Sequence, residues 1–431
     1  MPRGDNTPRP DSGLDPLLDG VRAWVAEQWD RDLTVREWWR RLFEAGYSHP
    51  TWPVGMGGLG TSSADARRIH GVLAASSVIA PPTGHVAAGL AAPTILDHGT
   101  AAQIAELVPP IARGEVAWCQ LFSEPGSGSD LASVGARAVR DGDEWIVTGQ
   151  KVWNSAADVA QLGMLLARTD PDQPKHRGMT YFVVDMDQAG VETRPLTQMN
   201  RSAEFCEVFL DEVRIPADRV IGELNGGWAV AQSTLGHERR SIAGRGLPGL
   251  IPARSGPAAG DLDLTCGEVI ERARTSVQQS RIPRGAIPGA MMIDLAREYG
   301  VDGDAVIRQR LARYHSNIKI NGWINQRIGV AGGRLTGADG SVSKIGTSRI
   351  CVESAELAFD VIGADTMLDG ADAPMDGELH HVGLASPGKR IGGGTDEIQL
   401  NVIGERALGL PREPGNDQDV PYRDLKVGTQ R

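Results

Sequence analysis

The sequence is poor in cysteine, has no dense run of basic residues and has no long apolar segment, and each shortage excludes a class of protein. Its four cysteines are far apart and show no paired spacing typical of metal ligands. We therefore expect reduced, partly buried thiols and no metal site. With a net charge of −11 and scattered lysines and arginines, the chain is not suited to bind nucleic acid or an anionic membrane.

Signals for export or membrane insertion are also lacking. Residues 1–16 are polar and contain several prolines and aspartates, without the apolar core of a signal peptide. No stretch reaches the apolar length that a membrane span needs. We therefore expect a cytoplasmic protein, and 431 residues are enough for two to four domains.

The periodicity of apolar residues divides the chain into three parts. It is helical at first, changes to a period of two between about Val116 and Ile215, and is helical again from Gly227 to about Leu410. Helices, strands and helices in separate blocks predict an α+β fold. We predict a disordered leader at 1–13, a helical domain at 14–114, a β domain at 115–218, a helical domain at 219–412 and a polar tail at 413–431, disordered unless it docks on a partner.

Some element ends are predicted more finely. A helix from Gln103 to Ile111 is expected to end near Pro109 and Pro110, because proline interrupts helical hydrogen bonding. The turn signal Asp141-Gly142 between two alternating segments predicts a β-hairpin. The expected strands are 144–148, 162–168, 179–186, 191–195 and 205–213.

The most informative stretch is Trp118–Ser155. Its loop Ser123–Asp130 contains one proline and two glycines, which favour a rigid turn with exposed amides and hydroxyls. Such a group of donors suits a phosphate or the polar edge of a planar cofactor. The strand that follows leads to Gly149–Ser155, where Trp153 offers a flat indole beside short polar groups. From the residues alone, a β domain with polar loops is an equally good interpretation.

A second candidate lies in the helix that follows the β domain. Glu238 falls on the apolar stripe formed by Trp228, Ala231, Leu235 and Ile242. Burial would raise the pKa of such a carboxylate toward neutrality, where it can accept and return a proton. The alternative from periodicity is an ion pair with a neighbouring arginine.

Two motifs in the stretch Trp118–Ser155 carry a resemblance to the acyl-CoA dehydrogenase family. They are the Ser-Glu-Pro-x-x-Gly-Ser-Asp type loop and the Gly-x-Lys-x-Trp-x-Ser segment, in the family's order and spacing. The sequence is most similar to members associated with actinobacterial steroid side-chain breakdown. The resemblance covers about residues 14–413 and implies an N-terminal helical domain, a β-barrel-like middle domain and a C-terminal four-helix bundle.

The resemblance also implies a reaction. It is the α,β-dehydrogenation of an acyl-CoA, in which a carboxylate removes the α-proton and a hydride passes to flavin N5. One branch of the family carries its catalytic Glu in this helix, followed by Arg, and Glu238-Arg239 matches that pattern. The commoner position of the base corresponds here to Gly393, which has no side chain, and Asp396 and Glu397 are shifted from it. The resemblance therefore implies Glu238 as the base.

By the same resemblance the cofactor is FAD. Ser123 and the Leu121 backbone would bond the isoalloxazine edge, Gly128 and Ser129 would lie near the pyrophosphate, and Trp153 would cover the ring. Ser155 would approach N5. The full implied set is Gln120, Leu121, Ser123, Gly128, Ser129, Trp153, Ser155, Asp360, Gly363, Gly394, Thr395 and Glu397 for FAD, and Ser129 and Arg239 for substrate. For Arg239 a structural ion pair is equally compatible.

Two departures from the family pattern concern partners. The Arg-x-x-Phe-Gly segment is absent, since residues 280–289 contain no Phe, and Gln-x-x-Gly-Gly is replaced by Asp360-Val-Ile-Gly363-Ala364. Both segments act across a subunit interface in the family. The chain is therefore expected to form either a homo-oligomer with a weakened FAD site or a heterotetramer with a related chain, and to pass electrons to an electron-transfer flavoprotein. A non-catalytic or half-site subunit, and an oxidase or monooxygenase on the same fold, remain open alternatives.

Overall fold

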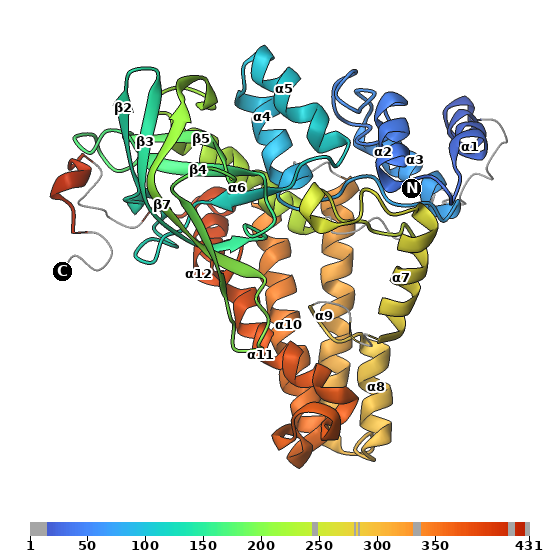
Figure 1. Ribbon diagram of the computed structural model, residues 1–431. Helices are drawn as coiled ribbons and strands as arrows, with labels where there is room; N and C mark the ends of the chain where they lie inside the picture. Colours follow the sequence, from blue (N-terminus) through green and yellow to red (C-terminus); the bar gives the residue numbers. More distant parts are fainter. Residues whose placement is uncertain are drawn as a thin grey trace, which may run out of the picture.

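The computed structural model describes residues 15–243, 249–279, 282, 285–330, 338–412 and 419–426. Figure 1 shows helices, then a sheet, then long helices along the chain, so the predicted α+β class is confirmed. Within the described residues, no helix is both long and apolar enough to cross a membrane. The four cysteines are buried thiols, as predicted.

Side-chain caps set the starts of the N-terminal helices. Asp15, Thr34, Ser62 and Thr100 each accept a hydrogen bond from a first-turn amide, and Thr100 forms a reciprocal capping box with Gln103. These caps fix where each helix leaves its loop. The helices are α1 (Pro16–Gln28), α2 (Val35–Glu44), α3 (Ser63–Ala75), α4 (Ala92–His98) and α5 (Ala101–Ala112).

Helix α5 ends one residue beyond its predicted last residue, Ile111, and is not interrupted at the two prolines. The helix continues through Pro109 and Pro110, and the carbonyls of both prolines accept from Arg113 (3.0 Å) and Glu115 (2.9 Å). The two missing amide donors are offset by burial of the side chains at this end of the helix, among them Val108 and Ile111. Tertiary packing therefore overrides the local signal.

The core of the N-terminal domain is built around two adjacent tryptophans of α2. Trp38 and Trp39 are both fully buried, and their indole N–H groups donate to the carbonyls of Ile79 (2.9 Å) and Ala80 (2.7 Å). Helix α7 (Cys266–Gln279) comes from the later part of the chain but buries Cys266 in this same core. The N-terminal core is thus closed by a helix that is remote in sequence.

Two histidines of this domain give a pH-dependence prediction. Burial, together with nearby His70, lowers the pKa of His49 to about 3, and burial lowers that of His70 to about 4. Both rings are neutral in the folded chain at pH 7, whereas the unfolded chain takes up protons below about pH 6.5. We therefore expect the free energy of unfolding to fall by about 1–2 kcal/mol per histidine between pH 7 and pH 5.

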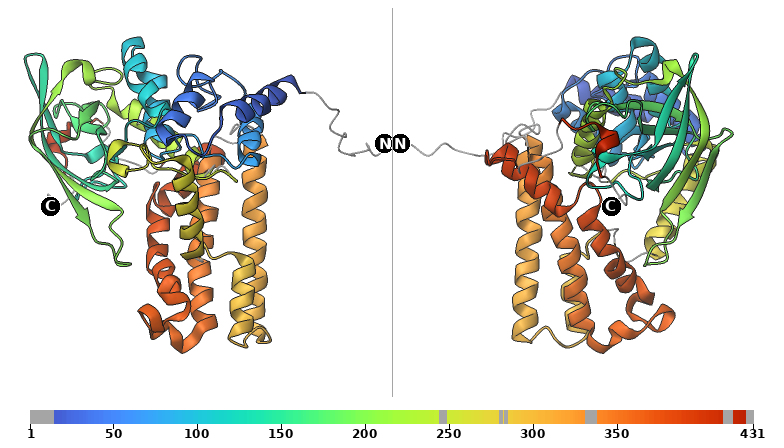
Figure 2. Two further views of the ribbon diagram at one scale, coloured as in Figure 1. Left: turned by 45° about the vertical axis from the view of Figure 1, so that its right-hand side comes forward. Right: turned by 90° about the vertical axis from the view of Figure 1, so that its left-hand side faces the viewer.

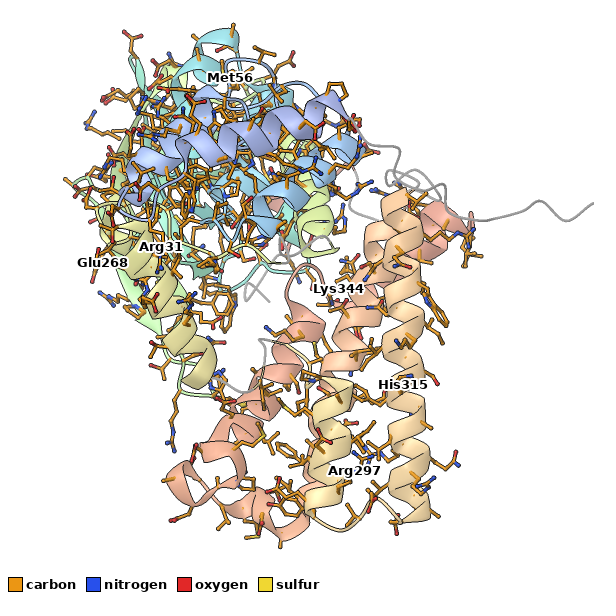
Figure 3. The ribbon with its side chains drawn as sticks, turned by 90° about the vertical axis from the view of Figure 1, so that its right-hand side faces the viewer. Arg31, Met56, Glu268, Arg297, His315 and Lys344 are labelled. Carbon is orange, nitrogen blue, oxygen red and sulfur yellow. The ribbon has the colours of Figure 1, made fainter. Side chains whose placement is uncertain are left out.

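Urea unfolding at the two pH values measures this effect. His49→Gln should remove about half of the pH-dependent loss. The matched control is His315→Gln, at an exposed position on α9 (Ala305–Val330), labelled in Figure 3, which should leave the loss unchanged. An identical pH dependence in His49→Gln and wild type would contradict the assignment.

The β domain is one mixed sheet of seven strands in the order β1-β4-β2-β3-β7-β6, with β5 paired to β4. β1 and β2 run parallel to β4, and the other pairs are antiparallel. The predicted hairpin at Asp141-Gly142 is present between β2 and β3, and Gly142 has the positive φ of 58° that this turn requires. The strands are β1 (Trp118–Leu121), β2 (Arg137–Asp141), β3 (Glu144–Ser155), β4 (Leu162–Arg168), β5 (Met179–Asp185), β6 (Val191–Leu196) and β7 (Phe205–Pro216).

The C-terminal helices form a bundle that projects away from the other two domains (Figures 1 and 2). Its core joins residues of α8, α9, α10 and α11, including Leu295, Tyr314, Leu357 and Leu379. Neither α8 nor α11 was predicted, because their apolar residues are interrupted by glycine, proline or charge. The remaining helices are α6 (Gly227–Ala243), α8 (Gly289–Glu298), α10 (Asp339–Ile362), α11 (Glu378–Ile391) and α12 (Asp396–Val402).

Helix α6 is the element that joins the three domains. It packs against β5 of the β domain, α4 of the N-terminal domain and α10 of the bundle. Gly227 begins the helix directly against the Thr180 backbone, where a Cβ would lie 2.7 Å from the carbonyl carbon. Residues carried by α6 are therefore held relative to all three domains.

Candidate active site

The loop Ser123–Asp130, called here the cofactor loop, is a compact turn at the end of β1. Backbone hydrogen bonds link Glu124 and Ser127 in both directions (2.9 and 3.0 Å), and the Ser127 hydroxyl donates to the Asp130 carbonyl (2.7 Å). Gly128 and Ser129 are exposed, and a Cβ on Gly128 would have no neighbour within 4 Å. The loop is thus rigid at its base and open at its tip.

A buried ion pair, which the sequence analysis missed, joins this loop to β3. Lys151 is fully buried, and its Nζ donates to Glu124 Oε1 (2.8 Å) and to the carbonyls of Phe122 (3.0 Å) and Leu166 (2.7 Å). Glu124 also accepts from the amides of Gly135 (2.7 Å) and Ala136 (2.8 Å). The Glu of the first motif and the Lys of the second therefore bind each other. The signal for this pair was the presence of one acid and one base at fixed positions of the two motifs, Glu124 and Lys151.

The end of β3 presents Trp153 to solvent. The pairing of β3 with β7 shifts register between Lys151 and Asn154, and Trp153 at this bulge has φ of 63°. A positive φ is costly for a bulky residue, and bulges redirect side chains beside functional sites. The indole is 59% exposed and meets Phe205 edge-on, with ring centroids 6.0 Å apart. The backbone thus holds an aromatic face open to a ligand.

Asn154, next to Trp153, ties β3 back to β1. Its side-chain nitrogen donates to the Gln120 carbonyl at 2.6 Å, and the side chain is only 1% exposed. In the described part of the chain, Asn154 Oδ1 has no hydrogen-bond partner. Gln120, Leu121, Ser123, Trp153 and Ser155 all lie at these joined ends of β1 and β3, so the structure brings together the β-domain residues implied for FAD.

Hydrogen bonds to residues of α4 and β5 fix the part of α6 that directly precedes Glu238. The Thr234 hydroxyl lies 2.9 Å from that of Thr94 and 3.3 Å from that of Tyr181. On the same helix, Ser233 bonds His98 (2.7 Å) and His237 bonds Asp97 (2.8 Å). These polar contacts from Ser233 to His237, about one turn of helix, fix the rotation of α6 directly before Glu238.

Glu238 is half-buried, so its desolvation is smaller than the apolar stripe predicted. Ala231 of that stripe is fully buried, Trp228 and Leu235 are partly buried, and the side chain of Ile242 lies outside the described residues. The stripe therefore faces the core at its start, and at Glu238 the helix has reached the boundary between protein and solvent.

The start of α10 brings α6 and α12 to one end of the bundle. A Cβ on Gly340 would lie 2.9 Å from the Cβ of Arg239, so the helices touch at this point. One turn later Lys344, almost fully buried, donates to Asp396 Oδ1 (2.9 Å) at the start of α12. Figure 3 shows Lys344 at the end of the bundle nearest the other domains. Arg239 of α6 and Asp396 of α12 thus both contact the first two turns of α10.

The Asp396 carboxylate has a structural role, because its oxygens accept hydrogen bonds from three side chains. It accepts from Lys344, from Ser348 (2.8 Å) and from Arg390 (2.9 Å). Burial acts to raise the pKa of Asp396, but the hydrogen bonds from Lys344 and Arg390 outweigh it and lower the pKa below its ordinary value. A carboxylate whose oxygens are already bound by three donors, and whose pKa is lowered by them, is a weak and inaccessible proton acceptor. This excludes one of the two acids near the commoner base position.

The turn before α12 is shaped around its glycines. Gly394 has φ of 83°, and a Cβ on it would lie 2.5 Å from Gln399 Nε2, which donates to the Gly393 carbonyl (2.7 Å). Thr395 caps α12 by accepting from the Ile398 amide (3.2 Å). Glu397 is exposed. The turn therefore has a fixed shape and presents backbone groups, with Glu397 pointing outward from the first turn.

Asp360 and Gly363 are not part of this cluster. They lie sixteen and nineteen residues after Lys344, at the far end of α10, roughly 25 Å away by helical rise. Asp360 is exposed and forms an ion pair with Arg310 of α9. These two residues therefore lie apart from the end of α10 that contacts α6 and α12.

The β-domain part of the site suits a flavin. It offers an exposed indole face, half-buried hydroxyls at Ser123 and Ser155, an unpaired buried amide oxygen at Asn154 and an open loop tip at Gly128 and Ser129. A planar ring with a polar edge and a phosphate tail needs such an arrangement. By contrast, no cluster of three or more metal-ligating side chains occurs in the described residues.

Comparison with known proteins identifies the family to which this fold and site belong. Acyl-CoA dehydrogenase models match the chain in all three parts: the N-terminal domain at residues 18–115, the middle domain at 119–213 and the C-terminal domain at 291–408. The chain belongs to the acyl-CoA dehydrogenase family. The predicted resemblance is therefore confirmed.

Individual relatives make the likeness more specific. The chain is 36% identical to acyl-CoA dehydrogenase IpdE1 of Mycobacterium tuberculosis, over 88% of each protein. It is 39% identical to acyl-CoA dehydrogenase FadE34 of the same organism, but spans only about half (49%) of that protein's length. Among solved structures, the Tcur3481-Tcur3483 steroid acyl-CoA dehydrogenase is similar, with a TM-score of 0.66 and 26% identity over 92% of this chain and 97% of that one. The Mycobacterium tuberculosis ChsE4-ChsE5 complex is also similar, with a TM-score of 0.63 and 25% identity over 93% of this chain and 100% of that one.

Proposed function

We propose that the protein is an FAD-dependent acyl-CoA dehydrogenase that introduces an α,β double bond into an acyl-CoA thioester, with Glu238 as the base. The observation that supports the proposal is at the start of α10, which contacts both Arg239, the neighbour of Glu238 on α6, and Asp396 of α12. Asp396 is enclosed by three donors and Gly393 has no side chain, so we assign the role of base to Glu238.

Each group has a defined part in this reaction. FAD, when bound, accepts the hydride that leaves the β-carbon. Glu238 takes the α-proton, and the hydrogen bonds that fix α6 hold it in place. Ser123, Ser155 and the backbone at Gln120 and Leu121 would hold the ring edge, with Trp153 over its face. Gly128 and Ser129 suit the phosphates, Gly394, Thr395 and Glu397 would meet the cofactor from the bundle side, and Arg239 and Ser129 would meet the coenzyme A moiety.

For the substrate we propose a bulky acyl-CoA of the steroid side-chain type. The support is the similarity to a solved enzyme described as a steroid acyl-CoA dehydrogenase. We expect the reaction in the cytoplasm, with an electron-transfer flavoprotein as acceptor.

A second candidate function is that of a half-site subunit. Asp360 and Gly363 lie about 25 Å along α10 from Lys344, which favours a role in a neighbour's site, and two of the similar structures are two-component assemblies. In a heterotetramer, a related chain with the full Gln-x-x-Gly-Gly sequence would complete the FAD site here. In a homo-oligomer, the sequence Asp360-Val-Ile-Gly363-Ala364 would take the place of that motif at every FAD site.

The decisive experiment is the visible absorption spectrum of the purified protein, followed by anaerobic addition of acyl-CoAs that include steroid thioesters. Bleaching of a bound flavin by one of them supports a self-sufficient dehydrogenase. Flavin that appears only when a related chain is added supports the shared site. Failure to bind flavin under either condition would overturn both proposals.

Trp153 gives a separate prediction. Trp153→Ala should raise the dissociation constant for FAD about tenfold, because an aromatic stacking contact is worth about 1 kcal/mol beyond buried area. The melting temperature should barely change, since the indole is exposed. Trp323→Ala on α9, exposed to a similar extent (64%), is the control for loss of a surface indole. Unchanged FAD affinity in Trp153→Ala would remove the assigned role.

A further inference from the structure

The end of the chain returns to the β domain. Residues 419–426, called here the C-terminal strap, lie against the loop between β4 and β5, where Tyr422 N donates to the Gln173 carbonyl (2.9 Å) and Arg423 N to that of Pro171 (3.0 Å). Pro421 also forms an isolated β-bridge with Pro174. In Figure 1 this short segment lies beyond the sheet, at the side opposite α1. The tail was predicted to be disordered unless it docked on a partner, and for residues 419–426 the docking surface is the chain's own β domain.

Tyr422 inserts its ring over a buried arginine. The guanidinium carbon of Arg168 lies 3.9 Å from the centre of the Tyr422 ring, and Arg168 is only 3% exposed. A stacked pair of this kind is strongest where water is excluded. The Tyr422 hydroxyl also lies 3.4 Å from the Ser133 carbonyl, and a Cβ on Gly135 would approach that hydroxyl to 2.9 Å. Glycine at position 135 thus leaves room for the tyrosine.

Arg168 links Tyr422 to the segment that follows the cofactor loop, because its guanidinium also bonds carbonyls of that segment. Its Nη2 donates to the carbonyls of Ala132 (2.7 Å) and Val134 (3.1 Å), and its Nη1 to that of Lys175 (2.8 Å). The amide of Gly135 is in turn bound by Glu124 of the cofactor loop. The strap, Arg168 and residues 131–136 therefore form one connected unit that ends at the proposed flavin loop.

We propose that the C-terminal strap positions the cofactor loop, with Tyr422 as a positioning residue that acts through Arg168. Without the Tyr422 ring, one face of the buried Arg168 guanidinium is exposed to water. Its hydrogen bonds to the carbonyls of residues 132 and 134 then become weaker. The loop then samples conformations that do not bind the flavin phosphates. The inference rests on the proposed function only for the identity of the ligand.

The test uses the full-length protein with Tyr422→Ala, Tyr422→Phe and, as control, Asp424→Asn at an exposed position of the strap. In Tyr422→Ala we expect hydrogen exchange of residues 131–136 to become about tenfold faster, and the FAD dissociation constant to rise about tenfold. Tyr422→Phe keeps the ring and should restore most of both values. In Tyr422→Ala, hydrogen exchange in the β6–β7 hairpin should match wild type. In Asp424→Asn, both the exchange rates and the FAD dissociation constant should match wild type.

Two results would overturn the proposal. One is unchanged exchange at residues 131–136 in Tyr422→Ala. The other is a lower melting temperature with exchange accelerated equally in the β6–β7 hairpin, which would show a general loss of stability. If no form of the protein binds FAD, the proposed function fails, and exchange at residues 131–136 still decides whether the strap holds the loop.

Discussion

Replacing Glu238 by Gln is expected to reduce the rate of flavin reduction by acyl-CoA by a factor of about 100 to 10,000, the range that general base catalysis supplies. The amide has nearly the same shape as the carboxylate but cannot accept the α-proton. Flavin content and the melting temperature should stay at wild-type values, because Glu238 is only half-buried and lies outside the cofactor loop. Stopped-flow absorbance under anaerobic conditions measures the rate directly.

The matched control is Glu298→Gln. Glu298 is an exposed acid at the end of α8, outside every residue set assigned to FAD or substrate. Its substitution should leave the reduction rate within about twofold of wild type, since an exposed carboxylate away from the site has no part in proton removal. The assignment is wrong if Glu238→Gln is reduced at the wild-type rate.

Replacing Lys151 by Met is expected to destabilise the protein by about 3–5 kcal/mol, because it removes one partner of a buried ion pair. Glu124 would keep its two backbone amides but lose its counter-charge, and the carbonyls of Phe122 and Leu166 would lose their donor. The measurement is the urea midpoint of unfolding. We also expect weaker flavin retention, since Lys151 is the link between the cofactor loop and β3.

A double-variant cycle separates the pair from other effects of the substitution. Adding Glu124→Gln to Lys151→Met should recover part of the loss, because no unpaired charge then remains buried. Arg194→Met is the control for an exposed pair on β6, where Arg194 and Glu192 are both more than half exposed, and should cost less than about 1 kcal/mol. Strictly additive effects of the two substitutions would contradict the assigned coupling.

The elements that the sequence predicted well are those with strong local signals. The strand 162–168 was predicted with the bounds that β4 has, because an apolar run there is bounded by turn residues on both sides. The hairpin at Asp141-Gly142 is equally local. β3, in contrast, continues past its predicted end at Thr148 to Ser155, because pairing with β7 extends it through a polar stretch. Helix α5 likewise continues past its prolines because of packing.

The sequence by itself determined the class of fold and the two motifs at the cofactor loop, which follow from periodicity, turn chemistry and residue identity along short stretches. Periodicity marked Glu238 as a carboxylate on an apolar stripe, and the family resemblance of Glu238-Arg239 made it the candidate base. Only the tertiary structure decided that Lys151 pairs with Glu124, that Asp396 is enclosed by Lys344, Ser348 and Arg390, and that the tail docks over Arg168. Each of these contacts joins residues that the chain brings together from separate elements. Their partners are selected by three-dimensional packing and by the cost of leaving a buried charge unpaired.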